Sequence, residues 1–210
     1  MPRPNRSYDA ARRVFDVLFA LPMLALTAPI FPLIAWLIRR ESRGPAIFRQ
    51  TRAGLHGKPF TVLKFRSMRM EGDPYGVSPH GHDDPRLTRI GRWLRETSLD
   101  ELPQFWNVLR GDMTLIGPRP LYVSQIEEWT PRQRLRLLVR PGMTGLSQVR
   151  GRAAIPVEEK MEIDAQYVLN RSPLLDARIL LATLAKVITR ADIYEVRYSR
   201  AAEFRGTRSE

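Results

Sequence analysis

The 210-residue chain has no cysteine, which excludes disulfide bonds and thiolate metal sites. Any bound metal must be held by oxygen or imidazole, and Mg²⁺ is the ion that carboxylates and phosphates suit best. The sequence has no internal repeat and no sign of a second large domain. Its length and its hydrophobic content of 43% predict one core domain with an attachment.

Acidic residues are scarce relative to basic ones. The chain has 34 Lys and Arg against 22 Asp and Glu, which gives a formal net charge of +12. This excess favours an anionic partner such as a nucleic acid, a nucleotide or an acidic membrane surface. Charge alone does not choose among these three.

Charged residues are also absent from Val17 to Ile38. The segment is about long enough to cross a hydrocarbon core of roughly 30 Å, so the simplest interpretation is a straight transmembrane anchor. A secretory signal peptide is not predicted, because the apolar segment is too long and no small-residue cleavage pattern follows it.

Two features favour a re-entrant helix over a straight span. Pro22, Pro29 and Pro32 lie inside the apolar segment, and basic residues stand on both of its sides. Positive charge near an apolar helix marks the cytoplasmic side. A helix that bends near Pro29 and returns to the same membrane face satisfies both observations.

The stretch from Asp84 to Pro120 contains two predicted helices. Asp84 and Pro85 read as a helix start, followed by a basic helix with its apolar positions at helical spacing. A second apolar repeat leads to Gly111, which is placed to end that helix. The apolar residues of the two repeats are Leu87, Ile90, Leu94, Leu102, Phe105, Trp106 and Leu109.

The adjacent carboxylates Asp100 and Glu101 lie between these helices. A capping box starting at Ser98 would give them a purely structural role. Pro103 instead favours Asp100 as the N-cap, because proline then falls in the first turn, where no donor is needed. An exposed, ionised Asp100 at a helix start could bind Mg²⁺ or attack phosphorus, while Glu101 handles protons.

The flanking segments predict smaller elements. Segments 46–52 and 60–68 read as a β-hairpin, and 70–83 as a surface loop whose His80, His82 and Asp83 do not make a dedicated metal site. Pro118-Arg119-Pro120 predicts a stiff turn that fixes the direction of one arginine; the alternative is a rigid loop with a solvated arginine.

Further along, 130–139 predicts a basic helix that suits an anionic headgroup layer or is a plain surface helix. Its arginines, with the one that follows it, are Arg132, Arg134, Arg136 and Arg140. Segment 146–152 is expected to be a strand, and 157–169 a helix with Asp164 and Tyr167 on one face. Ser172-Pro173 predicts the start of a helix that continues to Thr189.

Six motifs occur in one order along the chain. They are SRGPAIFRQTRAGLHGKPF from Ser42, KFRSM from Lys64, DPRLTRIGRWLRETSLDELPQ from Asp84, WNVLRGDMTLIGPRP from Trp106, RPGMTGLSQVRGR from Arg140 and DAQYV from Asp164. Together they closely resemble the monotopic phosphoglycosyl transferases, the bacterial sugar transferases that start glycan assembly on undecaprenyl phosphate. The resemblance covers the chain from Arg13 to about Thr189.

The resemblance implies an α/β fold of the α+β type, mostly helical with a small sheet, and a re-entrant N-terminal helix. We expect this helix and the basic N-terminus in 1–43, a cytoplasmic catalytic domain in 44–190 and a peripheral tail in 191–210. The localisation implied is the cytoplasmic face of the bacterial inner membrane. The membrane kink is expected at Ala28-Pro29, where the family commonly has serine before the proline; Thr27 could replace its hydroxyl by bonding to the preceding turn.

The activity implied is transfer of a sugar 1-phosphate from a UDP-sugar to undecaprenyl phosphate, with release of UMP. Asp100 is the expected nucleophile and Mg²⁺ ligand, and Glu101 is expected to manage protons or orient the metal. The expected substrate-binding residues are Lys64, Arg95, Pro118, Arg119, Pro120, Arg152, Asp164 and Tyr167. The family usually has Asn-Gly-Arg where this chain has Arg150-Gly151-Arg152.

Two other classes of protein fit part of the sequence. A membrane-tethered nucleic-acid binder would explain the charge but leave Asp100-Glu101 without purpose, so we expect no nucleic-acid partner. A non-catalytic membrane scaffold would explain the apolar segment and would tolerate alanine at Asp100. The sequence leaves open a homodimer, the sugar transferred and the glycan served.

Overall fold

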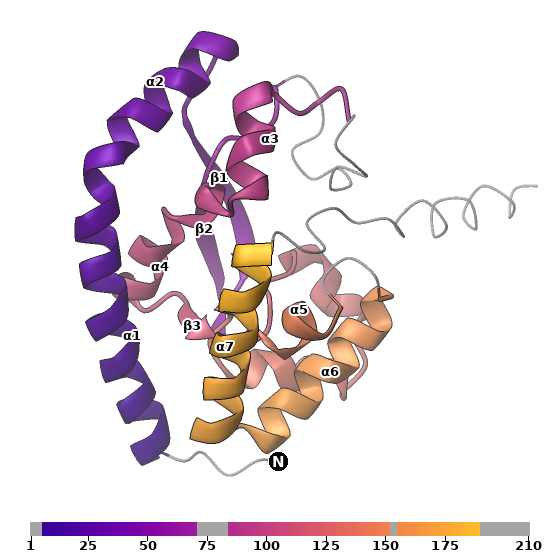
Figure 1. Cartoon of the computed structure of the whole chain (residues 1–210). Coiled ribbons are helices and arrows are strands. Elements are labelled where there is room, and N and C mark those ends of the chain that lie inside the picture. The colour runs from indigo at the N-terminus through magenta and orange to yellow at the C-terminus, as the bar shows by residue number, and fades with distance from the viewer. Residues whose placement is uncertain (1–5, 71–83, 152–154, 190–210) are drawn as a thin grey trace, which may run out of the picture.

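The computed structural model describes residues 6–70, 84–151 and 155–189, and its fold is mostly helical with two small sheets (Figure 1). The described α-helices are α1 (Arg6–Thr27), α2 (Phe31–Glu41), α3 (Arg89–Glu96), α4 (Gln104–Arg110), α5 (Leu146–Gly151), α6 (Val157–Asn170) and α7 (Pro173–Thr189). The strands are β1 (Ile47–Ala53), β2 (Pro59–Phe65), β3 (Thr114–Ile116) and β4 (Gly142–Thr144). Five 3₁₀ segments connect them: η1 (Ala28–Ile30), η2 (Leu55–Gly57), η3 (Leu99–Glu101), η4 (Val123–Glu128) and η5 (Gln133–Leu138).

Helices α1 and α2 follow one another along one side of the molecule, joined by η1 (Figure 1). From Ser7 to Glu41 they form the one helical segment, within the described residues, that is long and apolar enough to cross a membrane. The α-helical hydrogen bonding is interrupted at Ala28-Pro29, where a bend was expected. Thr27 Oγ1 donates to the Met23 carbonyl at 2.7 Å, which confirms the predicted bonding to the preceding turn.

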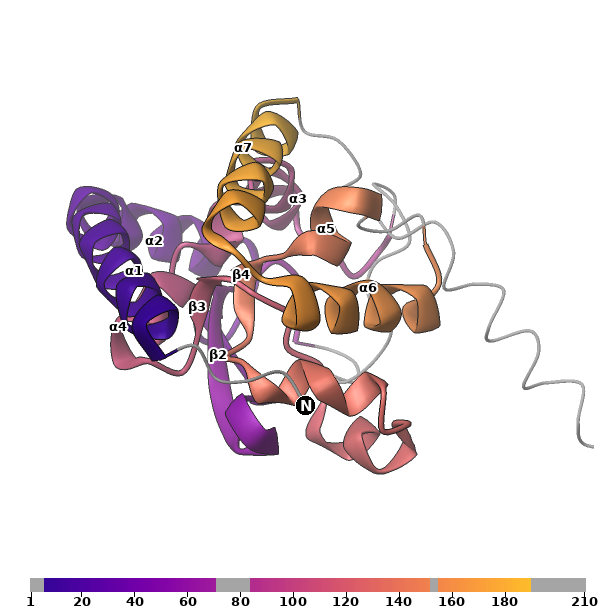
Figure 2. The same ribbon diagram turned by 90° about the horizontal axis from the view of Figure 1, so that it is seen from below.

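One face of this long helix packs on the domain and the other is exposed. Ala20, Ile34 and Ile38 are buried in the core, and Phe31 packs edge-on against Phe65 of β2 with ring centroids 4.9 Å apart. The opposite face exposes large apolar side chains, among them Leu18, Leu21, Leu26, Leu33 and Trp36. The view from below in Figure 2 shows α1 and α2 at one side and α5 and α6 at the other.

The predicted hairpin is confirmed. Strands β1 and β2 pair antiparallel, and η2 turns the chain between them with His56 in the left-handed region. The Asn107 side chain ties α4 to this sheet. Its Oδ1 accepts from the Leu63 N–H at 3.1 Å, and its Nδ2 donates to the Thr61 carbonyl at 2.7 Å. This bonding holds α4 against β2, next to Lys64.

The helix predicted to start at Asp84 starts later. Leu87 forms a β-bridge with Met68 instead, and Thr88 is the N-cap of α3, its hydroxyl accepting from the Gly91 N–H at 2.9 Å. Gly91 is needed there because an added Cβ would lie 1.9 Å from the Ser67 carbonyl oxygen. The tight contact fixes α3 against the segment that follows β2.

The prediction that Asp100 caps a helix is also wrong. Asp100 lies inside η3, whose N-cap is Ser98 in the left-handed conformation, and α4 starts only at Gln104 with Pro103 as its N-cap. Because Pro103 has no N–H, the α-helical ladder cannot run back through it, and the residues before it form a 3₁₀ turn. Helix α4 ends at Gly111 with φ 85°, as predicted.

The C-terminal half differs from expectation at two elements. Segment 146–151 is helix α5 and not a strand, and 133–138 is the 3₁₀ segment η5 and not an α-helix. Helices α6 and α7 are confirmed, and the N-cap of α7 is Ser172, whose Oγ accepts from the Leu175 N–H at 3.3 Å. Strands β3 and β4 pair in parallel, which places the end of β3 beside the chain that follows Arg140. Of the predicted loop 70–83, residues 71–83, which include His80, His82 and Asp83, lie outside the described residues.

Candidate active site

The site is centred on Asp100, Glu101 and Lys64. Lys64 Nζ lies 2.7 Å from Glu101 Oε1 and 4.0 Å from Asp100 Oδ2. One cation therefore contacts both members of the carboxylate pair. Glu101 Oε1 also lies 3.5 Å from Nη1 of Arg119, which stands in the turn after β3. Three motifs that are far apart in the sequence meet at this point.

Asp100 is buried, which corrects the expectation that it is exposed. Only 6% of the residue is accessible. Burial raises the pKa of the Asp100 carboxyl, whereas the nearby Lys64 charge opposes this shift. The negative charge of Glu101 also raises the pKa of Asp100, whereas the charges of Arg95 and Arg119 lower it, as that of Lys64 does. Cations thus lie near a carboxylate whose charged form is disfavoured by burial.

Arg95 is a further cation near Asp100, and its side chain is fixed by a hydrogen bond. It occupies the last turn of α3, and its Nε donates to Ser67 Oγ at 2.9 Å. Ser67 follows β2 and is buried, so the bond links α3 to the strand that carries Lys64. Ser67 is a site residue that the sequence analysis missed, although it lies within the KFRSM motif.

Arg119 is held through its backbone. Its carbonyl accepts a hydrogen bond from Arg136 Nη2 at 2.6 Å, and the same nitrogen donates to Asp164 Oδ2 at 2.8 Å. Asp164 Oδ1 in turn accepts from Ser147 Oγ at 2.7 Å. The side chain of Arg119 stays about half exposed and points a charge toward Glu101. The turn thus holds the backbone of Arg119 in place, and a role of its side chain in phosphate recognition stays a prediction.

The arginines of this segment were suggested to face a lipid headgroup layer, but Arg136 does not. It is buried, with 5% of the residue accessible, and its pKa is lowered by burial although Asp164 opposes this. Arg132, by contrast, is on the surface and pairs with Glu162 at 2.8 Å. The two arginines are four residues apart, and only tertiary packing distinguishes them.

Asp164 and Tyr167 lie one turn apart on α6, but each bonds to a different part of the protein. Asp164 pairs with Arg136, whereas the Tyr167 hydroxyl donates to Asp176 Oδ1 at 2.8 Å. Both are almost fully buried. In this structure they support the framework, and direct contact with substrate stays a prediction. Arg152, another expected substrate ligand, lies outside the described residues.

The carboxylate pair would hold Mg²⁺ only together with oxygens from substrate and water. Within 6–70, 84–151 and 155–189, no three His, Asp or Glu side chains gather as a ready-made metal cage. Mg²⁺ is commonly held by one or two carboxylates together with substrate phosphates and water. Asp100 and the adjacent Glu101 provide the carboxylate part of such a donor set, with Arg95 and Arg119 near Asp100.

Comparison with known proteins agrees with these motifs. The family model described as bacterial sugar transferase matches residues 7–190. The chain is 43% identical to an uncharacterized sugar transferase, EpsL, of Bacillus subtilis, over 93% of this chain and 96% of EpsL. It is 41% identical to the UDP-glucose:undecaprenyl-phosphate glucose-1-phosphate transferase of Caulobacter vibrioides, over 92% of this chain and 75% of that protein.

A third relative is longer. The undecaprenyl-phosphate galactose phosphotransferase of Salmonella typhimurium is 39% identical over 90% of this chain, which corresponds to 42% of the relative. The family model covers most of the chain, and two of these relatives are matched over most of their length. The chain therefore belongs to the bacterial sugar transferase family.

Proposed function

We propose that the protein transfers a sugar 1-phosphate from a UDP-sugar to undecaprenyl phosphate and releases UMP. The names of the Caulobacter and Salmonella relatives support this substrate class. The observation that carries the proposal is the contact of Lys64 with both Asp100 and Glu101, next to Arg119. This arrangement offers a nucleophilic carboxylate with cations positioned around it.

In the first step, an Asp100 carboxylate oxygen attacks the sugar-bearing phosphorus of the donor. A bond forms between that oxygen and phosphorus, the bond from phosphorus to the bridging oxygen breaks, and UMP leaves with the bridging oxygen. Arg95 and Arg119 spread the charge that develops on the departing UMP. Lys64 helps to keep Asp100 ionised against the effect of burial.

In the second step, a phosphate oxygen of undecaprenyl phosphate attacks the same phosphorus. A bond forms between that oxygen and phosphorus, and the bond from phosphorus to the Asp100 oxygen, an acyl phosphate linkage, breaks. The Asp100 carboxylate is regenerated, and the product is the sugar diphosphate lipid. Glu101 accepts the acceptor's proton if the acceptor arrives protonated, and its bond to Lys64 orients that lysine. When bound, Mg²⁺ would neutralise part of the diphosphate charge, with Asp100 as its protein ligand.

We further propose that α1 and α2 form a re-entrant membrane helix on the cytoplasmic face of the bacterial inner membrane. The exposed apolar face of both helices supports burial in lipid. Helix α7 exposes Leu181, Leu184 and Ile188 and could lie in the interface. We propose 1–43 as the membrane unit, 44–190 as the catalytic domain and 191–210 as the tail, and we leave a homodimer open.

The proposed reaction is tested by UMP release. Purified protein, undecaprenyl phosphate and Mg²⁺ are incubated with a panel of UDP-sugars, and UMP is measured for each donor. We expect release with one donor or a small group of donors, and none without acceptor beyond one equivalent. A protein that acts only as a scaffold or binds nucleic acid would release none with any donor.

Metal removal gives a second expected result. EDTA should stop UMP release and added Mg²⁺ should restore it, because the diphosphate carries more charge than the arginines around Asp100 compensate. EDTA saturated with Mg²⁺ beforehand is the matched control and should not inhibit. Full activity in free EDTA would contradict the assigned metal.

A further inference from the structure

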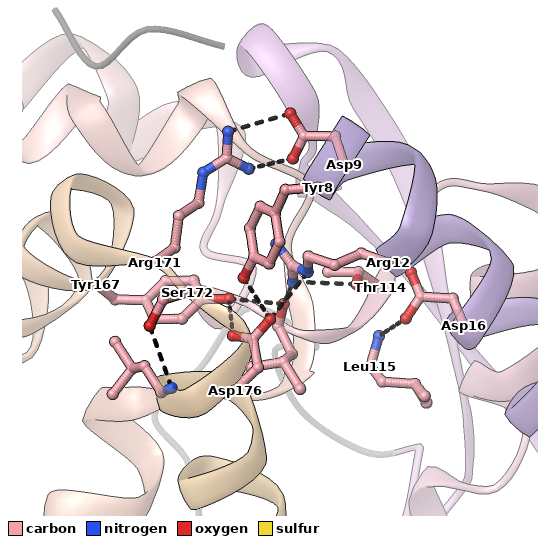
Figure 3. A network of polar contacts seen from close by, with 12 residues as sticks. Tyr8, Asp9, Arg12, Asp16, Thr114, Leu115, Tyr167, Arg171, Ser172 and Asp176 are labelled. Atoms are coloured by element: carbon pink, nitrogen blue, oxygen red, sulfur yellow. Dashed lines mark hydrogen bonds and ion pairs between the residues drawn. The ribbon is translucent and has the colours of Figure 1, made fainter. Parts of the chain in front are cut away.

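The N-terminal part of α1 carries a row of polar residues that bond to the catalytic domain. Tyr8 donates to Asp176 Oδ2 at 2.5 Å, and Arg12 Nε lies 3.2 Å from the same oxygen (Figure 3). Tyr167 donates to the other oxygen of Asp176. Asp176 is buried in the first turn of α7 and thus joins α1, α6 and α7. A buried charge with this many partners strongly favours one arrangement of the three helices.

The same face of α1 also holds β3. Asp16 is buried, and its Oδ1 accepts from the Leu115 N–H at 2.9 Å (Figure 3). Arg12 Nη2 donates to the Ile116 carbonyl and lies 3.4 Å from Thr114 Oγ1. Within the described residues β3 pairs with β4 alone. Asp16 and Arg12 add hydrogen bonds to the backbone of Leu115 and Ile116, which tie β3 to α1.

Strand β3 leads directly into the catalytic turn. Gly117 follows Ile116, and Pro118-Arg119-Pro120 comes next, with two prolines that limit independent movement of the turn. A shift of β3 would therefore be passed to Arg119. Misplacing a charged group in an active site by about 1 Å can reduce the rate roughly a hundredfold.

Two further contacts extend the pattern to the Asp100 segment. Arg13 donates to the carbonyls of Val108 and Leu109, the latter at 2.7 Å, near the end of α4. At the end of α2, the Glu41 carboxylate accepts from the N–H groups of Arg89 at 2.5 Å and Ile90 at 2.8 Å, at the start of α3. The long helix thus contacts the elements on both sides of Asp100.

We infer that α1 is a positioning element of the active site, and that Arg12 and Asp16 set the position of Arg119 through β3. The inference rests on the proposed function for its kinetic readout. It assigns α1 a role beyond attachment to a membrane, because an attachment would need only the apolar face. Arg12 and Asp16 are positioning residues and do not touch the proposed substrate.

The test uses the full-length protein reconstituted in lipid nanodiscs. Asp16→Leu removes the acceptor of the Leu115 N–H, whereas Asp16→Asn keeps an acceptor oxygen at that place. We expect Asp16→Leu to lower kcat for UMP release between about tenfold and a hundredfold, with a smaller change in the donor KM, and Asp16→Asn to restore most of it. Arg12→Gln should lower kcat similarly and serves as a second variant if Asp16→Leu does not fold.

Asp9→Asn is the matched control. Asp9 lies on the same helix, but its carboxylate pairs with Arg171, which follows α6 and is not part of β3 (Figure 3). This variant should keep kcat within about twofold of the wild-type value, since the active-site geometry is unaffected. Equal losses in Asp9→Asn and Asp16→Leu would mean that any weakening of α1 packing suffices, which would overturn the specific role.

A double variant separates positioning from general stability. If Arg12 acts through Arg119, then adding Arg12→Gln to Arg119→Ala should reduce kcat far less than it does in the wild-type background. Fully additive losses would refute the coupling. Hydrogen exchange of a peptide covering 114–121 gives a readout independent of activity: it should rise in Asp16→Leu and not in Asp9→Asn. Unchanged exchange would overturn the inference, whereas absent wild-type UMP release would overturn only the proposed reaction.

Discussion

Asp100→Asn is expected to abolish sugar-phosphate transfer and leave the protein folded. The amide has nearly the shape of the carboxylate but cannot act as the anionic nucleophile. The protein should tolerate the change, because the carboxylate is buried and burial already disfavours its charge. Lys64 would keep its contact with Glu101 at 2.7 Å. We expect a loss of kcat of about a thousandfold or more, as for removal of a covalent nucleophile.

Mass spectrometry of the intact protein measures the covalent step directly. With donor and Mg²⁺ but no acceptor, the wild-type protein should gain the mass of one sugar phosphate, and Asp100→Asn should gain nothing. Glu101→Gln is the matched control, since it keeps the nucleophile and should still gain the mass, more slowly. Turnover by Asp100→Asn at about a tenth of the wild-type rate would show that Asp100 is not the nucleophile.

The parts of this site that could be predicted from sequence are those encoded locally. Gly57 lies in the turn between β1 and β2 and Pro59 starts β2, and both favour the hairpin without help from distant residues. Gly111 ends α4 because its φ of 85° suits glycine. Pro118 and Pro120 likewise make a stiff turn in any context. Ordered motifs around these points were enough to suggest the family.

The missed features depend on tertiary contacts. Leu87 fits a helical repeat, yet its backbone pairs with Met68, and the helix starts two residues later at Arg89. A bridge between distant segments leaves no trace in a local periodicity. Arginine usually lies on the surface, and the burial of Arg136 is explained only by its partner Asp164 on α6. Position along the chain does not distinguish it from the exposed Arg132.

Asp100 illustrates how the two kinds of information combine. Pro103 correctly indicated that a regular α-helix could not start at Ser98. The chain forms a 3₁₀ turn before Pro103, however, and Asp100 is not a helix N-cap. The expected exposure of Asp100 followed from its assignment as a helix N-cap, so the error in the helix start also produced the error in exposure. The pKa of Asp100 then depends on burial and on Lys64, which is on another element. The chemical environment of Asp100 could therefore be known only from the tertiary structure.

Contacts at both ends of the long helix bear on its membrane topology. Near its start, Tyr8 and Arg12 bond to Asp176 of α7, and near its end Glu41 bonds to the first N–H groups of α3. Because α3 and α7 belong to one folded domain, we expect both ends of the helix to lie on the side of the membrane where that domain is. A straight span would separate them and break one set of contacts. This favours the re-entrant arrangement over a simple anchor.

Cysteine labelling of intact cells should therefore find both ends of the helix inside. The chain has no native cysteine, so Arg6→Cys and Ser42→Cys each give a single probe without background. We expect an impermeant thiol reagent to label neither probe in intact cells and both once the inner membrane is opened. The unsubstituted protein is the control and should not react in either case. Labelling of one probe alone in intact cells would establish a crossing. A domain on one side of the membrane cannot bind both ends of a spanning helix. That result would therefore also mean that the contacts of Asp176 or those of Glu41 are absent in the membrane-bound protein.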